Sequence, residues 1–578
     1  MSFQSQESAN TPVQQSLKKF WGATALLSIL LTVIAWLSFS FNDKSPPIAT
    51  VTFLFMAACL TMLMCVRYAL LIPNGRKLFG VIILVSVVFR AMFLVTPPIM
   101  EIDYFRYLWD GKVAQAGFSP YRYSPDQVLR KLPNQSEEYS GVVNVSVQSA
   151  SVHEILSRVH FPNYTTIYPP VSQAVFAWAV KWVSPQASVK RHVWTLRLVL
   201  VLFDLGTLAA LVLLLRYLQR HVGWSIVWAW NPLTLKEIAN SGHLDSIVVF
   251  FMFVSIAGLI MASQCHTAQP DLRKQKVKKT LWLLQSTFCL ALAIGAKLFP
   301  LILLPAFFVN WWYISKRGAL GLTVLLVLAT AVVMWPMLRQ NPNIPRHLSR
   351  LGILQQDKEV DPLVLENLNS EGLSGFLSRW RINDPIFELA YDNLHPRQDQ
   401  NLNQPPYAFV PLKTKQWLND WVDTWNPTRM RPAFLIARCL TFGLFLLIYL
   451  MCLRKFLTND PHQLLANFFF VLVAFLLLQP TVNPWYWLWA LPLSMFAKNR
   501  GWLLLPALLF IYYLRFRFRR WDGVYEVLGN SYSGSGLFDN FVIFAELGLI
   551  AIVLIVGHFR SRQSDGYDEN ETEAKSED

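Results

Sequence analysis

The feature that most constrains this 578-residue chain is a series of long apolar runs with few charged residues. A helix needs about 20 apolar residues to cross the hydrocarbon core of a bilayer. Runs close to that length are 20–41, 49–66, 78–97, 195–217, 246–264, 280–297, 318–338, 433–453, 463–480 and 540–558. Shorter candidates are 171–183, 223–239, 299–315, 484–497 and 501–514. The pattern predicts an all-α integral membrane protein, a polytopic bundle of about 14 transmembrane helices.

The composition excludes two other classes of protein. Hydrophobic residues make up 54% of the chain and charged residues only 15%, against about 25% charged residues in soluble proteins. A soluble globular enzyme and a disordered protein are therefore both excluded. The net charge of +15 is compatible with nucleic-acid binding. However, the basic residues mostly flank apolar runs, which is typical of cytoplasmic loops, so we expect membrane lipids and no nucleic acid as partners.

The basic turns predict the orientation. Arg67, Arg76 and Lys77 separate the second and third spans, and a cluster of Lys and Arg fills 273–279. Basic loops favour the cytoplasm, so residues from 98 onward are expected outside. Two long outer segments follow, about 98–168 and 339–432.

We expect three regions along the chain. These are a cytoplasmic tail (1–19), a polytopic membrane domain (20–558) and an acidic, disordered cytoplasmic tail (559–578). The run 171–183 either lies in the interface or crosses, in which case 223–239 does not cross. Both alternatives leave 240–245 outside.

The first candidate site opens the first outer segment. Glu101 and Asp103 follow Pro97 and Pro98 at the end of a span. Two carboxylates this close can act as general base toward an acceptor hydroxyl, or hold a divalent metal. The alternative interpretation is an acidic helix cap beside Arg106.

A second polar turn, 240–246, lies between two apolar runs on the same face. Its His243 and Asp245 could bind a sugar or phosphate, or share a proton relay. The alternative is a helix start capped by Asp245 or Ser246. Just before it, Lys236 and Glu237 either pair with each other or face a cavity.

Other polar or aromatic residues have two interpretations each. Lys297 either binds an anionic headgroup or extends to the interface. In the aromatic turn 479–487, Trp485 and Tyr486 form either a membrane belt or a wall that stacks on sugar rings. Four outer arginines either bind a lipid phosphate or mark an inside anchor: Arg515, Arg517, Arg519 and Arg520. Asp204 lies within a span and requires a partner, for which we expect a hydrogen bond to a neighbouring helix.

Several short motifs occur in one order along residues 78 to 500. They are 103–111 (DYFRYLWDG), 117–123 (GFSPYRY), 168–170 (YPP), 230–233 (WNPL), 241–245 (SGHLD), 297–300 (KLFP) and 483–486 (NPWY). Together they resemble the GT-C class of membrane glycosyltransferases, closest to bacterial and archaeal polytopic mannosyltransferases. They are similar, more distantly, to the enzyme that adds the first mannose of GPI anchors.

The resemblance implies an inverting transfer of a hexose, most simply mannose, from a polyprenyl-phosphate donor to a lipid or glycan acceptor outside the cell membrane. It gives Asp103 the role of catalytic base, with Glu101 as its acidic partner and metal binding left open. It also implies that 168–170 begins an interfacial helix and that 371–391 helps to enclose the acceptor. The residues expected to bind substrate are Arg106, Asp110, Tyr168, His243, Asp245, Lys297, Trp485, Tyr486, Arg515 and Arg517.

Two other functions stay open at this point. A transporter or flippase for a lipid-linked sugar would need a polar path across the bilayer and, usually, paired halves. The chain shows no internal repeat. An oligosaccharide polymerase or ligase would also act at the outer face, and differs from a transferase in using a diphosphate-linked oligosaccharide as donor.

Overall fold

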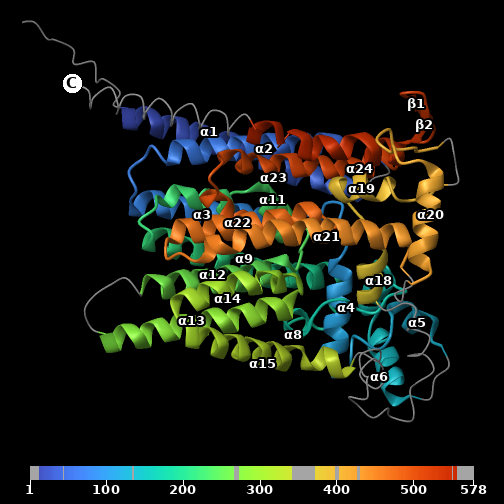
Figure 1. The fold of residues 1–578 in the computed structure, drawn as a ribbon, viewed down its shortest axis with the longest axis horizontal. Helices are drawn as coiled ribbons and strands as arrows, with labels where there is room; N and C mark the ends of the chain where they lie inside the picture. Colours follow the sequence, from blue (N-terminus) through green and yellow to red (C-terminus); the bar gives the residue numbers. More distant parts are fainter. Residues whose placement is uncertain are drawn as a thin grey trace, which may run out of the picture.

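The chain folds into a bundle of long, roughly parallel helices (Figure 1). The computed structural model describes residues 12–42, 45–132, 136–265, 272–340, 372–397, 402–425, 430–549 and 551–555. The predicted tail 559–578 and most of the first tail, 1–11, therefore lie outside the described residues, as do 341–371 of the second outer segment.

Eleven helices in this described part are long and apolar enough to cross a membrane. Nine are single helices: α1 (Pro12–Leu37), α2 (Ile48–Ala69), α3 (Arg76–Val95), α9 (Val189–Tyr217), α12 (Asp245–Gln264), α13 (Leu272–Ala296), α15 (Lys316–Gln340), α21 (Pro432–Leu453) and α22 (Pro461–Leu478). The other two, Arg500–Phe518 and Gly534–Ile555, are composite. They are built from η9 (Arg500–Leu504), α23 (Leu505–Leu508), η10 (Leu509–Tyr513) and α24 (Leu514–Phe518), and from α25 (Gly534–Leu537), η11 (Phe538–Val542) and the helical residues after them. The prediction of a multi-pass, helical membrane protein is confirmed. The count of 14 crossings stays a prediction.

The remaining predicted runs are short or broken. They form α8 (Pro170–Lys181), the series η2 (Val222–Ser225), α10 (Ile226–Ala229), α11 (Pro232–Thr234) and η3 (Leu235–Asn240), the pair η4 (Phe299–Leu303) and α14 (Leu304–Ile314), and the pair η7 (Pro484–Trp489) and η8 (Leu491–Phe496). Proline opens many of these pieces, because it fits the first helical turn but cannot continue a helix. The element η3 is a π-helix.

One end of the bundle carries the short helices of the two predicted outer segments and two short strands, and we call it the loop end. Figure 1 shows them on its right-hand side. They are α4 (Tyr104–Gln115), α5 (Pro125–Arg130), α6 (Glu137–Ser146), α7 (Ala150–Ser157), α18 (Gly372–Arg379), α19 (Pro385–Asp392), α20 (Leu412–Asp423), β1 (Val524–Val527) and β2 (Asn530–Ser533). The short η1 (Ser38–Asn42) follows α1, and η6 (Arg454–Phe456) follows α21. Both predicted outer segments therefore meet at the loop end.

Basic side chains gather at the opposite end, which we call the basic end. The Arg216 guanidinium lies 4.4 Å from the centre of the Phe79 ring, and that of Arg500 lies 4.4 Å from the Trp224 ring. Lys279 donates to the Ile314 carbonyl at 3.3 Å. Each of these contacts joins two segments that lie far apart in the chain.

The strands β1 and β2 were not expected from the sequence. They pair antiparallel, with Val524 opposite Ser533. The turn between them holds Leu528 at φ 52° and Gly529 at φ 77°, the positive values that a tight hairpin turn requires. An isolated bridge joins Leu402 to Ser531, so the hairpin is fixed to the second outer segment.

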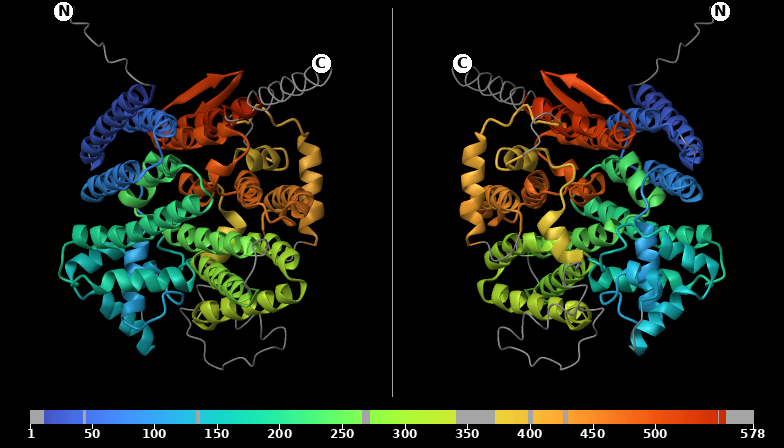
Figure 2. Two further views of the ribbon diagram at one scale, coloured as in Figure 1. Left: turned by 90° about the vertical axis from the view of Figure 1, so that its left-hand side faces the viewer. Right: turned by 90° about the vertical axis from the view of Figure 1, so that its right-hand side faces the viewer.

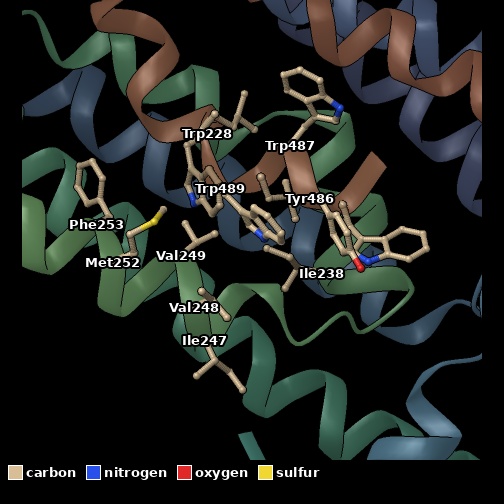
Figure 3. Close-up of a cluster of buried hydrophobic side chains, with 14 of the residues drawn as sticks. Trp228, Ile238, Ile247, Val248, Val249, Met252, Phe253, Tyr486, Trp487 and Trp489 are labelled. Carbon is tan, nitrogen blue, oxygen red and sulfur yellow. The ribbon is translucent and has the colours of Figure 1, made fainter. Parts of the chain in front are cut away.

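The core around the broken segments is apolar and closely packed. Figure 3 shows Ile238, Val249 and Trp489 together where η3, α12 and η7 meet. One buried polar pair in the core is formed by Asp204 of α9, whose carboxylate accepts hydrogen bonds from Nε (2.5 Å) and a terminal nitrogen (2.9 Å) of Arg90 in α3. Asp204 therefore has the partner on a neighbouring helix that its position requires.

Candidate active site

A cavity of about 340 Å³ opens at the loop end. Its polar wall comes from the start of α4, the segment 160–169, the start of α12 and the turn after α13. Its aromatic wall is η7, and its apolar wall comes from α18, α21 and α22. Of the predicted site residues, those in the wall are Asp103, Arg106, Tyr168, Asp245, Lys297, Trp485 and Tyr486.

Asp103 occupies the N-cap position of α4, but its side chain makes no capping hydrogen bond. The carboxylate lines the cavity instead. Its Oδ1 lies 4.0 Å from Nδ1 of His160. Asp103 therefore lies at the helix start without capping it by a hydrogen bond, and its role as catalytic base stays a prediction.

His160 is a wall residue that the sequence did not single out. Burial lowers its pKa, and so do the nearby charges of Arg106 and Arg519, while Asp103 acts in the opposite direction. Its ring stacks on Phe161, with ring centres 3.9 Å apart. The His160 imidazole thus lies beside the Asp103 carboxylate, where its surroundings favour the neutral form.

Glu101 does not join Asp103 in the cavity wall. Its Oε1 is buried without a hydrogen-bond partner, and burial raises the pKa of the carboxyl to about 8. Within the described ranges no three His, Cys, Asp or Glu side chains gather as a metal site would require. The pair Glu101 and Asp103 therefore does not fit a divalent metal.

Arg106 and Asp110 hold the polar wall in place. A terminal nitrogen of Arg106 donates to the carbonyls of Phe161 (2.9 Å) and Tyr164 (3.0 Å). Asp110 is buried and accepts from Gln173 of α8 at 3.3 Å. Arg106 thus fixes the segment that carries His160, and Asp110 joins α4 to α8. Asp110 does not reach the cavity, so its expected role in substrate binding is not supported by this geometry.

Lys297, Asp245 and two aromatic rings form one cluster. The Lys297 Nζ lies 2.8 Å from Asp245 Oδ1, which also accepts from Trp489 Nε1 at 2.5 Å. The same Nζ lies 4.0 Å from the centre of the Tyr486 ring. Figure 3 shows Tyr486 and Trp489 side by side on η7. The cluster presents a cation, a carboxylate and flat rings to one space, a combination suited to a phosphorylated sugar.

His243 lies behind this wall. Its ring stacks on Trp485 at 4.0 Å between centres, and its Nε2 is 3.3 Å from Glu237 Oε2. Glu237 pairs with Lys236 at 3.2 Å, and both contact the Tyr513 hydroxyl. Lys236 and Glu237 therefore pair with each other, and His243 supports Trp485 from behind. A direct substrate contact of His243 stays a prediction.

The arginines after residue 514 lie at the loop end but outside the cavity wall. Arg515 pairs with Asp539 at 3.3 Å, and Arg517 lies over the Trp521 ring at 5.7 Å. Phosphate binding by Arg515 and Arg517 stays a prediction. The apolar wall of the cavity contains Arg438 of α21, a cation that was not predicted from the sequence.

Comparison with known families gives this cavity a chemical context. A model of the alpha-(1->6)-mannopyranosyltransferase family, N-terminal domain, matches residues 9–315, more than half of the 578 residues. The chain belongs to this family. It is accordingly a multi-pass mannosyltransferase, which transfers mannose from a sugar donor to an acceptor. No curated protein and no solved structure matches the chain.

The residues matched by the family model form only one part of the cavity wall. Asp103, His160, Asp245 and Lys297 all fall within the matched residues. The aromatic wall of η7 and the apolar wall of α18, α21 and α22 fall beyond them. The two parts come together only in the folded chain, which is why no single stretch of sequence describes the whole site.

Proposed function

We propose that this mannosyltransferase takes mannose from a polyprenyl-phosphate donor and transfers it to a lipid or glycan acceptor on the outer face of the cell membrane. The proposal includes GT-C-type chemistry, in which the configuration at the anomeric carbon inverts and a side chain acts as base. It requires no nucleotide at the site, because the leaving phosphate is already attached to the lipid.

One observation carries the proposal: a single cavity joins a carboxylate to an apolar wall made by spans. Asp103 stands on one side. On another stand Phe442 and Phe445 of α21 with Phe475 and Leu478 of α22. A water-soluble donor would gain nothing from an opening between membrane helices, whereas a lipid chain would bury apolar surface there.

In the proposed reaction the acceptor hydroxyl oxygen attacks the anomeric carbon as the bond from that carbon to the phosphate oxygen breaks. Asp103 accepts the hydroxyl proton, and the phosphate departs with its lipid. Lys297, held by Asp245, stabilises the negative charge that develops on the leaving group. The rings of Tyr486 and Trp489 support the sugar. Base assistance of this kind contributes about 10²- to 10⁴-fold in rate.

The test offers labelled polyprenyl-phosphate mannose, glucose and arabinose to membranes that contain the protein. We expect label from the mannose donor in a lipid or glycan product. Asp103→Asn should lose about 10²-fold or more of this activity at unchanged expression. The matched control is Asp126→Asn, since Asp126 belongs to the same outer segment but pairs with Arg130 and does not line the cavity.

Two further donors distinguish the alternatives. A nucleotide-activated mannose tests a cytosolic-type donor, and a diphosphate-linked oligosaccharide tests the polymerase or ligase. Transfer from either of these but not from polyprenyl-phosphate mannose would refute the proposed donor. Wild-type turnover in Asp103→Asn would refute the proposed base.

A further inference from the structure

Helix α20 displays its tryptophans on the surface. Trp417 is 64% exposed and Trp421 53% exposed, and Trp425, just after the helix, is 52% exposed. A helix that docks on a protein through its apolar face would bury such rings. Here the aromatic side chains recur every four residues and therefore form one row along the helix.

The side of α20 that faces the protein is largely polar. Lys415 donates to the Asp392 carbonyl at 2.6 Å, and Asn419 donates to the Leu394 carbonyl at 2.8 Å. Val422 is buried beside them. These contacts fix the helix on the end of α19 without using the tryptophan row.

A third row completes the surface of the helix. Gln416, Asp420 and Asp423 are exposed and recur every three or four residues. At 3.6 residues per turn this charged row lies on a different side from both the tryptophan row and the docked side. The helix therefore presents three distinct surfaces, one to protein, one aromatic and one charged.

The placement of α20 identifies what covers the aromatic row. Figure 1 shows α20 running across the direction of the spans, and Figure 2 shows it at the edge of the bundle in both end-on views. It packs against α21, on which the apolar side chains Leu440 and Leu444 are exposed. The aromatic row therefore lies beside a span that also exposes apolar side chains.

We propose that α20 lies in the headgroup layer of the bilayer, with its tryptophan row in the lipid interface and its charged row in water. Tryptophan is enriched at this depth because its ring is apolar and its N–H can bond to headgroups or water. The segment 412–425 is then a membrane-surface anchor and not part of an aqueous loop. Since α20 precedes α21, it fixes the beginning of the span that carries Arg438 and Phe442 at a defined depth.

The test measures the depth of single nitroxide labels in the full-length protein. The six native cysteines are replaced by alanine, and one cysteine is introduced at position 417, 421 or 425, or at the control positions 416 and 423 of the charged row. The labelled protein is reconstituted into vesicles of phosphatidylcholine and phosphatidylglycerol. Collision rates with oxygen, which concentrates in lipid, are compared with those of a water-soluble nickel chelate.

We expect a severalfold higher oxygen-to-nickel ratio at 417 and 421 than at 416 and 423. Equal, water-like ratios in both rows would overturn the proposal. Two other results would also overturn it. Protection of the 417 and 421 labels from collisions by soluble mannan would identify a glycan as the occupant. Spin–spin broadening between protomers would identify a second copy. Because all five positions are exposed, labelling leaves the fold intact, and mannosyl transfer by each variant checks this.

Discussion

The pair Arg90–Asp204 joins two spans through two hydrogen bonds. Both side chains are nearly inaccessible, at 2% and 1% exposure, and Arg90 also donates to the Ala229 carbonyl at 2.7 Å. The pair thus joins α3, α9 and the broken segment that leads to the cavity.

Removing one partner of this pair should therefore be costly. Arg90→Met leaves the Asp204 charge buried alone, for which we expect a loss of about 3–5 kcal/mol. The measurement is the thermal unfolding midpoint in detergent. The double variant Arg90→Met, Asp204→Leu should recover most of the loss, and an equally unstable double variant would contradict this account.

The buried carboxyl of Glu101 should make the stability of the folded protein depend on pH. Burial raises the pKa of its carboxyl from 4.5 to about 8, so the folded state favours the protonated form. The resulting stability is fully present below about pH 4.5 and is lost as pH rises through about 8.

In the variant Glu101→Gln the side chain at this position is neutral at every pH. We expect this variant to unfold at a higher temperature than the wild type above about pH 8, and to show a shallower decline across the interval below it. Glu137→Gln, on the exposed first turn of α6, serves as the control. Parallel pH profiles of wild type and Glu101→Gln would show that this carboxyl does not titrate as inferred.

At the scale of elements, the contact between α4 and α8 shapes the polar wall. A Cβ added at Gly111 of α4 would lie 2.7 Å from the backbone of Phe176 in α8. Asp103 precedes α4 and Tyr168 precedes α8, so the distance between the two helices determines the width of the cavity.

Gly111→Ala should force these helices apart, at a cost of about 1–3 kcal/mol, and reduce mannosyl transfer more than stability alone explains. The control is Gly80→Ala in α3, where an added Cβ meets nothing within 4 Å. Stability and transfer rate are measured on the same preparations. Full activity of Gly111→Ala would show that the cavity tolerates movement of its polar wall.

The elements also show what a sequence can and cannot predict here. The long spans could be predicted because crossing a bilayer requires a run of apolar residues that is visible in the chain. The breaks inside 222–240 and 484–497 could be predicted only in outline from their prolines. The π-helix at Leu235–Asn240 could not, because its buried contacts, such as those of Lys236 and Glu237 with Tyr513, join segments far apart in the sequence.

Some residues of the site could likewise be predicted from the sequence, and others could not. Motifs led to Asp103, Asp245 and Lys297, which line one cavity. His160 was missed because it lies in a polar segment without periodicity, and Arg438 because it lies within an apolar run. Both come to the cavity through packing between distant segments, which no local pattern records.

The whole molecule has two unlike ends, and this asymmetry predicts its orientation. The basic end gathers the turns that hold Arg216, Lys279 and Arg500, and such turns favour the cytoplasm. The cavity opens at the loop end. If the basic end is cytoplasmic, the cavity faces the side of the membrane where nucleotide sugars are absent and lipid-linked sugars are available.

Cysteine labelling in intact cells tests this orientation directly. Glu137 on α6 and Lys278 on α13 are exposed at opposite ends. We expect a membrane-impermeant maleimide to label Glu137→Cys in intact cells and Lys278→Cys only after permeabilisation. The reverse result would turn the cavity toward the cytosol, where a nucleotide-activated mannose is available. The chain would still be a mannosyltransferase, but the reason for a lipid-linked donor would be lost.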